Sequence, residues 1–182
     1  MKKNSIYIFL LSACLLTACH DEAKKQPRQD EKKTEQVENN DVRSTPMPDF
    51  SLPDMNGNPT SAMEYVAKNK ITIIDFWASW CGPCRAEMPN VVALYEANKD
   101  KGLGIIGVSL DNNAEAWKTA VKEMNMNWLQ VSDLKGWDCE AAKLFGIESI
   151  PFTLIVNKEG HLLAFNLRGE QLKEFISQKL SE

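Results

Sequence analysis

Two cysteines, Cys81 and Cys84, lie where a strand pattern changes into a helix pattern, and this junction constrains the chain more than any other feature. Residues 71–77 are β-branched or aromatic apart from one aspartate, which predicts a buried strand. Pro83 suits the first turn of a helix, because it has no N–H to leave unpaired there. Cys81 therefore faces free backbone N–H groups and the positive end of a helix dipole, which favour the thiolate. We expect Cys81 to be a nucleophile in disulfide exchange and Cys84 to be the resolving thiol.

A zinc half-site is the alternative interpretation of this cysteine pair. Structural zinc needs four ligands, usually from two such pairs or from a Cys pair and a His pair. Beyond the first 19 residues the sequence adds only Cys139, His20 and His161, at no recognisable spacing. The sequence therefore favours redox use, with a Cys81–Cys84 disulfide as the redox centre and no metal or other cofactor.

The remaining thiol and several tryptophans are interpreted as packing residues. Cys139 is small and isolated, so packing is favoured over redox use, although a leftover thiol in an oxidising compartment is worth following. Trp77 belongs to the predicted strand and is assigned to the core. Trp117 and Trp137 are assigned to core or surface packing.

The residues around the cysteine pair resemble the thioredoxin superfamily. The run Asp-Phe-Trp-Ala-Ser-Trp-Cys-Gly-Pro-Cys ends at Cys84, Pro89 stands where that family has a kinking helix proline, and Ile150-Pro151 resembles its cis-proline loop. The continuation Arg-Ala-Glu-Met-Pro is closer to the TlpA/ResA-like, AhpC/TSA-type envelope branch than to cytosolic thioredoxins. The resemblance spans the chain from about residue 46 to the end. It implies a thioredoxin-like α/β fold, in which helices flank both faces of a mixed central β-sheet.

The hydrophobic pattern of the whole domain agrees with an α/β fold, because strands alternate with helices before a final hairpin. Strands are expected at 49–52, 71–77, 103–110, 128–131, 152–156 and 161–167. A short helix is expected to open at Ser61, and further helices are expected at 83–98, 114–124, 138–145 and 172–180. Ser61 and Glu64 form a capping-box pattern, and Asp138 is expected to cap the helix that follows it.

Two carboxylates near the pair are candidate proton or tuning groups. Asp75 lies in the otherwise apolar strand, where burial would raise its pKa toward neutrality. The family resemblance implies that it assists deprotonation of Cys84. The alternative is an outward-facing, solvated carboxylate. Glu87, one turn after Cys84, is either a group that tunes the same thiols or a surface carboxylate.

Substrate contacts are expected around the cysteines and at the proline loop. The resemblance implies a cis bond before Pro151, which leaves the Ile150 backbone to pair with an extended substrate segment. Trp80 offers apolar contact area beside Cys81, and Gly82 and Pro83 complete the expected substrate surface.

The N-terminus reads as a targeting segment followed by a tether. Residues 1–18 combine two lysines with a short apolar run and end in Leu-Thr-Ala before Cys19, which resembles a bacterial lipobox cut ahead of a lipidated cysteine. An uncleaved anchor is the alternative. Residues 19–48 interleave both charge signs without an aromatic residue, so a disordered tether is expected ahead of the domain at 49–182. Either way, the domain is expected outside the cytoplasm, on the inner or outer membrane, facing the periplasm or exterior.

These features together predict a membrane-tethered thiol–disulfide oxidoreductase. The net charge of −4 and the lack of a basic cluster argue against nucleic-acid binding. Gly-Pro between the cysteines resembles low-potential thioredoxin, and this resemblance implies a reductant of protein disulfides, reset by a membrane thiol reductase as electron donor. The ResA-like resemblance makes apocytochrome c a candidate substrate. The alternatives are a peroxiredoxin-like peroxidase, although Ala78 stands where a hydroxyl residue is expected, and a non-catalytic metal- or partner-binding module.

Overall fold

The computed structural model describes residues 45–182. The predicted signal segment, the lipidation site at Cys19 and all but the last residues of the tether lie outside the described residues. The strands are β1 (Ser51–Pro53), β2 (Pro59–Ser61), β3 (Ile71–Trp77), β4 (Leu103–Ser109), β5 (Leu129–Val131), β6 (Phe152–Asn157) and β7 (Leu162–Phe165). The helices are α1 (Ala62–Val66), α2 (Gly82–Asn98), α3 (Ala114–Glu123), α4 (Glu140–Leu144) and α5 (Gly169–Ser181), with 3₁₀ turns η1 (Lys99–Lys101) and η2 (Gly136–Asp138).

A five-stranded mixed sheet forms the centre of the domain, in the order β5-β4-β3-β6-β7. β3 runs parallel to β4 and antiparallel to β6, and β4 runs parallel to β5. β1 and β2 pair as a separate small hairpin. Because β3 has a strand on each side and helices over both faces, all seven of its residues are buried. The mixed central sheet predicted from the sequence is confirmed.

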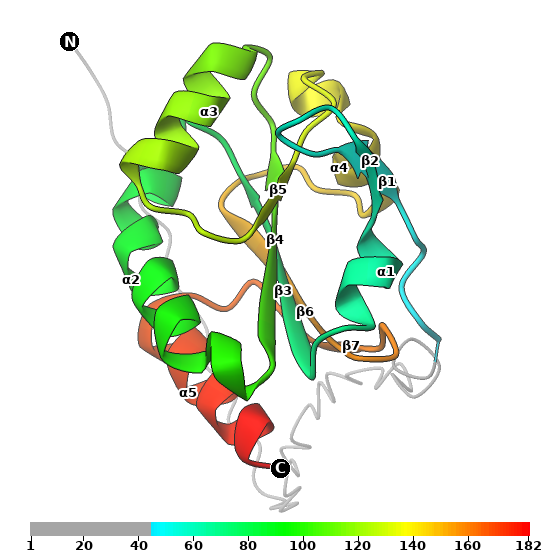
Figure 1. The fold of residues 1–182 in the computed structure, drawn as a ribbon, viewed down its shortest axis with the longest axis vertical. Helices are drawn as coiled ribbons and strands as arrows, with labels where there is room; N and C mark the ends of the chain where they lie inside the picture. The colour runs from blue at the N-terminus through cyan, green and yellow to red at the C-terminus, as the bar shows by residue number, and fades with distance from the viewer. Residues whose placement is uncertain (1–44) are drawn as a thin grey trace, which may run out of the picture. The chain divides into compact units, whose positions relative to one another are not determined.

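Helices cover both faces of this sheet. α2, α3 and α5 lie on one side, and α1 and α4 lie on the other (Figure 1). The right-handed rule for crossovers between parallel strands places α2 and α3 on the same side, since β3, β4 and β5 follow one another across the sheet. α5 returns along α2 after the β6–β7 hairpin (Figure 1).

The core packs closely around β3 and β4. Trp77 is completely buried, as predicted, and its indole N–H donates to Gln130 Oε1 at 3.2 Å. Gly107 faces that amide from β4, and a Cβ added there would come within 2.2 Å of Gln130 Oε1. Glycine at this position therefore makes room for the Gln130 amide that accepts from the Trp77 indole.

The segment 138–145 differs from the sequence-based expectation. Asp138 ends the η2 turn, and its side chain pairs with Lys143 at 2.7 Å instead of capping a helix. α4 begins only at Glu140, whose backbone N–H donates to Asp133 Oδ2 at 3.0 Å. The predicted Asp138 cap is wrong because Asp133, seven residues before the helix, supplies the acceptor.

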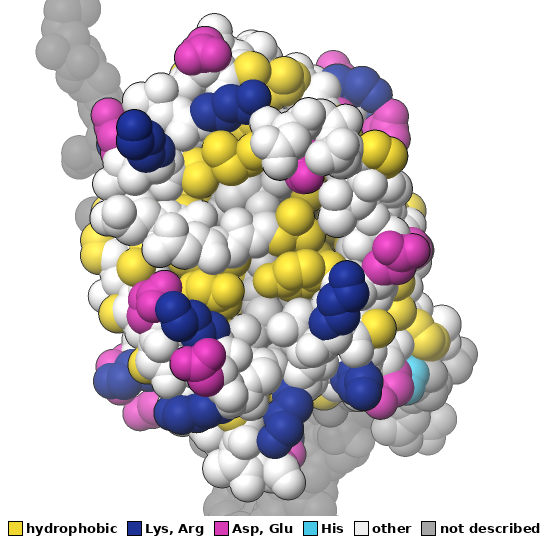
Figure 2. Space-filling model, viewed as in Figure 1, with side chains coloured by type: hydrophobic (Ala, Val, Ile, Leu, Met, Phe, Trp, Pro, Cys, Tyr) yellow, Lys and Arg dark blue, Asp and Glu magenta, His cyan; other side chains and the backbone are white. Residues whose placement is uncertain are grey.

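The surface carries both charge signs. On the face drawn in Figure 2, Lys and Arg side chains are interspersed with Asp and Glu side chains. Among the helices that the structure describes, none is both long enough and apolar enough to cross a membrane.

Candidate active site

The cysteine pair sits at the end of β3, where the chain turns into α2. Cys81 is the N-cap residue of α2, and its Sγ accepts a hydrogen bond from the Cys84 backbone N–H at 3.2 Å. The two residues form a disulfide, with Cα atoms 5.3 Å apart. Cys81 is 5% exposed and Cys84 1%, so an incoming reactant reaches Cys81 first. The fold therefore places Cys81 at a helix N-terminus, where a thiolate is stabilised.

The loop that carries the pair is anchored by Asp111, a residue that sequence analysis missed. Asp111 is 1% exposed and follows the end of β4. Its carboxylate accepts from the Ser79 hydroxyl at 2.6 Å, from the Ser79 backbone N–H at 3.0 Å and from the Ser109 hydroxyl at 2.7 Å. A charged residue directly after a predicted buried strand was the available signal. The anchor fixes the loop just ahead of Cys81.

Asp75 is buried in the middle of β3 and is not the solvated carboxylate of the alternative interpretation. It is 4% exposed and pairs across the sheet with Gly107 and Thr153. The pKa of its carboxyl is raised to about 7, chiefly because burial disfavours the charged form and also because of the negative charge of Glu87, while the positive charge of Arg168 lowers it. A group with this pKa exchanges a proton at neutral pH.

A small cavity lies between Asp75 and Cys84. It measures about 10 Å³ and is lined by Asp75, Cys84, Glu87, Pro151 and Arg168, among others. This volume is close to the least that holds one water, so no substrate side chain enters it. Asp75 therefore faces Cys84 from inside the domain, and Cys81 is the more exposed of the two cysteines.

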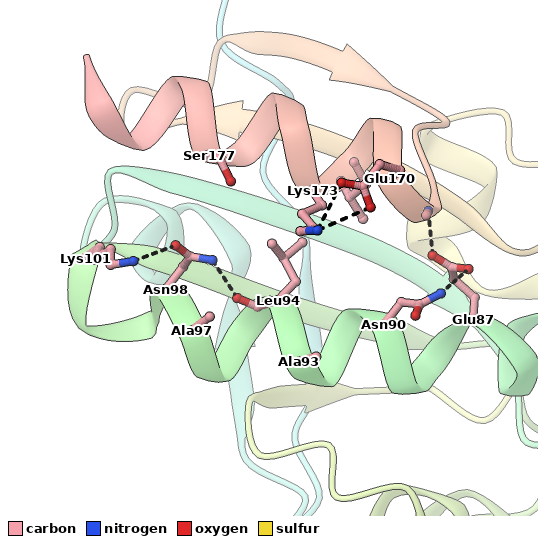
Figure 3. A pocket seen from close by; sticks show the side chains of 12 residues that line it. Glu87, Asn90, Ala93, Leu94, Ala97, Asn98, Lys101, Glu170, Lys173 and Ser177 are labelled. Carbon is pink, nitrogen blue, oxygen red and sulfur yellow. Dashed lines mark hydrogen bonds and ion pairs between the residues drawn. The ribbon is translucent and has the colours of Figure 1, made fainter.

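Glu87 is half-buried and bridges two helices. It lies on α2 one turn after Cys84, and its Oε1 accepts from the Gly169 backbone N–H at 2.7 Å, where α5 begins (Figure 3). Its Oε2 accepts from Asn90 Nδ2 at 3.3 Å (Figure 3). Glu87 also lines the groove of about 500 Å³ between α2 and α5 (Figure 3). The charge of Glu87 thus affects the pKa of Asp75, and its hydrogen bond caps the start of α5.

The proline loop lies opposite the cysteines. The Ile150–Pro151 bond is cis, Pro151 is buried, and Ile150 is half-buried. Within the described part of the chain, the Ile150 backbone N–H and C=O make no hydrogen bond. They are available to an extended partner segment, the recognition mode in which main-chain hydrogen bonds give affinity.

An exposed tryptophan next to the disulfide lies close to a second exposed tryptophan. Trp80 is 54% exposed beside Cys81, and Trp137 from η2 is 48% exposed, with its ring centroid 6.3 Å from that of Trp80. Gly82 and Pro83 are also exposed. Sequence analysis placed Trp80 at this surface but gave Trp137 only a packing role, because nothing in the local pattern brings η2 next to α2.

Cys139 lies in an environment that does not favour a reactive thiol. It is fully buried, and burial raises the pKa of its thiol, with a smaller contribution from the negative charge of Asp133. A raised thiol pKa disfavours the reactive thiolate. Among residues 45–182, no group of three or more His, Cys, Asp and Glu side chains is arranged to hold a metal ion.

The comparisons with known proteins fit this geometry. The model of the AhpC/TSA family matches residues 44–165 of the chain. The chain belongs to the AhpC/TSA family. The thiol-disulfide oxidoreductase ResA of Bacillus thuringiensis subsp. konkukian is 30% identical over 135 residues, which are 74% of this chain and 75% of that protein. The sporulation thiol-disulfide oxidoreductase A of Bacillus subtilis is 30% identical over 117 residues, 61% of this chain and 69% of that protein.

Solved structures give the same assignment. A thiol-disulfide oxidoreductase from Bacteroides fragilis matches with a TM-score of 0.68 and 32% identity, covering 74% of this chain and 98% of that one. StoA from Bacillus subtilis matches with a TM-score of 0.57 and 28% identity, covering 71% of this chain and 96% of that one. This chain is a TlpA/ResA-like member of the thioredoxin superfamily and a thiol–disulfide oxidoreductase.

Proposed function

We propose that this oxidoreductase is a membrane-tethered reductant of protein disulfides in the bacterial cell envelope. The observation that carries the proposal is the position of Cys81 at the N-terminus of α2, bonded to Cys84 and flanked by the cis-proline loop and the buried Asp75. The predicted lipid at Cys19 supplies the tether, and the domain faces the periplasm or exterior.

The first chemical step is attack of the Cys81 thiolate on a substrate disulfide. A Cys81–substrate disulfide forms, the substrate disulfide breaks, and the departing substrate sulfur leaves as a thiolate that takes a proton from solvent. The free Ile150 backbone and the exposed Trp80 hold the substrate segment against the cysteines.

The second step depends on Asp75. Its carboxylate accepts the proton of the Cys84 thiol across the small cavity, and the Cys84 thiolate then attacks Cys81 Sγ. The second substrate sulfur leaves, so the substrate gains two electrons and the Cys81–Cys84 disulfide forms. Because the pKa of Asp75 is about 7, a large fraction of this carboxyl is ionised at neutral pH and is able to accept that proton.

Return to the reduced form requires two electrons and two protons from a dithiol donor. A membrane thiol reductase fits this need, since the tether holds the domain at a membrane. The resemblance to the ResA-like branch favours apocytochrome c before haem attachment as a substrate.

Trapping tests the proposal directly. Cys84→Ala removes the resolving thiol, so mixed disulfides on Cys81 should accumulate in cells and be released by dithiothreitol. The matched control is Cys81→Ala, which should trap little. Envelope proteins identified in the Cys84→Ala complexes support the proposal, and an absence of complexes, or equal trapping by Cys81→Ala, contradicts it.

An activity assay separates this function from the peroxidase alternative. The purified protein with dithiothreitol should accelerate insulin disulfide reduction and should not accelerate peroxide consumption. The reverse pattern would favour the peroxidase.

A further inference from the structure

The turn between β7 and α5, residues 166–169, connects two parts of the active site. The Arg168 guanidinium donates to the Pro151 carbonyl oxygen and to Asn166 Oδ1, the latter at 2.8 Å. The next residue, Gly169, donates its backbone N–H to Glu87 Oε1 on α2 at 2.7 Å (Figure 3). One short turn thus contacts the cis-proline loop and the helix that carries Cys84.

The turn is itself fixed to β6, the strand that follows the proline loop. The Asn166 backbone N–H donates to the Thr153 carbonyl at 2.7 Å, and the Thr153 hydroxyl donates to the Leu167 carbonyl at 3.0 Å. Asn166 has a φ of 55°, in the left-handed region that asparagine tolerates. These contacts give the Arg168 side chain a rigid base.

Arg168 also lies at the edge of the cavity that Asp75 shares with Cys84. The titratable and charged residues that line the cavity with Asp75 are Glu87 from α2, Arg168 from the turn, and Cys84, which is uncharged in its disulfide; β6 contributes Thr153, which carries no charge. The Glu87 charge raises the pKa of Asp75 and the Arg168 charge lowers it. The positive charge of Arg168 therefore counteracts part of the rise in the Asp75 pKa that burial causes.

We propose that Arg168 is a positioning residue for disulfide exchange, which fixes the cis-proline loop through Pro151 and places a positive charge beside Asp75. One side chain then links the surface that receives the substrate to the group that takes the Cys84 proton. This inference rests on the proposed role of Asp75 and adds a residue that has no thiol or proton chemistry of its own.

The two roles of Arg168 are separable by substitution. Lysine keeps the charge, but its ammonium lies one bond nearer the backbone than Nη2, the Arg168 atom that donates to both oxygens, whereas glutamine loses the charge and is shorter still. Lys173→Gln is the matched control, because Lys173 is an exposed cation on α5 that pairs with Glu170 at 3.0 Å.

Two measurements on the full-length protein in detergent distinguish the roles. The first is the titration of the Asp75 carboxyl in the oxidised protein, followed by carbon NMR of labelled aspartate and assigned with Asp75→Asn. The second is KM and kcat for reduction of a peptide disulfide, with dithiothreitol as electron source. The titration needs no turnover, so an inactive wild-type protein would contradict the proposed function without deciding the role of Arg168.

For Arg168→Gln we expect an Asp75 pKa above the wild-type value and a KM about tenfold higher, as loss of a hydrogen bond from a charged donor predicts. For Arg168→Lys we expect a near wild-type Asp75 titration and a raised KM, and for Lys173→Gln neither change. An Arg168→Gln protein whose KM or Asp75 titration matches that of Lys173→Gln overturns the proposal. If Arg168→Gln does not fold, an unchanged KM in Arg168→Lys overturns it equally.

Discussion

At the scale of single residues, the site contains a carboxyl that is buried where its ionised form is disfavoured. Asp75 is buried on β3 and has a pKa of about 7, because burial and the Glu87 charge outweigh the Arg168 charge. Its place in the strand and its motif were readable from the sequence. Arg168 was not, because an arginine before a glycine in a surface turn carries no local signal, and its partners Pro151 and Asp75 are distant in sequence.

Asp75→Asn should slow the resolving step and change how stability depends on pH. The folded-state pKa lies above the value of 3.8 expected for an unfolded aspartate, so the carboxyl favours folding below pH 4 and loses this contribution as pH rises to about 7. Asparagine does not ionise, so Asp75→Asn does not lose stability in this way as the pH rises. Relative to wild type, the variant should therefore gain about 2–3 kcal/mol in free energy of unfolding between pH 5 and pH 8.

Denaturant unfolding of the oxidised proteins at both pH values measures this gain. Asp100→Asn, which removes an exposed carboxylate and keeps Asp75, is the control, and its free energy of unfolding should fall from pH 5 to pH 8 as that of wild type does. A difference between Asp75→Asn and wild type that is equal at pH 5 and pH 8 would mean that Asp75 titrates normally.

At the scale of elements, α5 begins where α2 provides a cap. The sequence predicted a helix from residue 172, but α5 starts at Gly169, whose N–H donates to Glu87 Oε1. The Arg168 N-cap residue contributes no side-chain cap, so the acceptor comes from a helix 82 residues earlier. The same reason explains α4, which Asp133 caps in place of Asp138. Helix existence followed from hydrophobic periodicity, whereas these boundaries depend on tertiary contacts.

Substitutions of Glu87 separate its charge from its hydrogen bond. Glu87→Gln keeps an acceptor for Gly169 but removes the charge that raises the pKa of Asp75, so the pH midpoint of the resolving step should fall. Glu87→Ala should also lower the free energy of unfolding by about 1–2 kcal/mol, as the α5 cap is lost.

Single-turnover kinetics from pH 5 to pH 9 and denaturant unfolding give the two readouts, with the exposed Glu170→Gln as control. A midpoint that stays at the wild-type value in Glu87→Gln would show that the Glu87 charge does not reach Asp75.

At the scale of the whole molecule, the thioredoxin-like arrangement was predictable because its strands and helices are encoded locally. The apolar runs of β3 and β4 and the Cys-Gly-Pro-Cys junction fix the centre of the sheet and the start of α2. The pairing of Trp80 with Trp137 and the Asp111 anchor arise only when β4, η2 and α2 meet. Local sequence patterns do not predict such tertiary contacts between distant elements.

The tether is a separate prediction for the whole chain. Cys19→Ala should abolish lipid attachment and release the protein from membranes, because Cys19 is the expected acylation site. Cys14→Ala is the matched control and should remain labelled, since Cys14 lies in the segment expected to be removed. Palmitate labelling followed by membrane fractionation measures both variants, and label that persists in Cys19→Ala contradicts the lipobox.

The central claim is that Cys81 is the attacking thiol, and alkylation of the reduced protein tests it most directly. A brief pulse of limiting iodoacetamide, followed by peptide mapping over a range of pH, should label Cys81 first, with an apparent pKa below the free-thiol value of about 8.5. Cys139 is an internal control that should react only after unfolding, because it is fully buried and its thiol pKa is raised. Label that appears first on Cys84 or Cys139 would contradict the account.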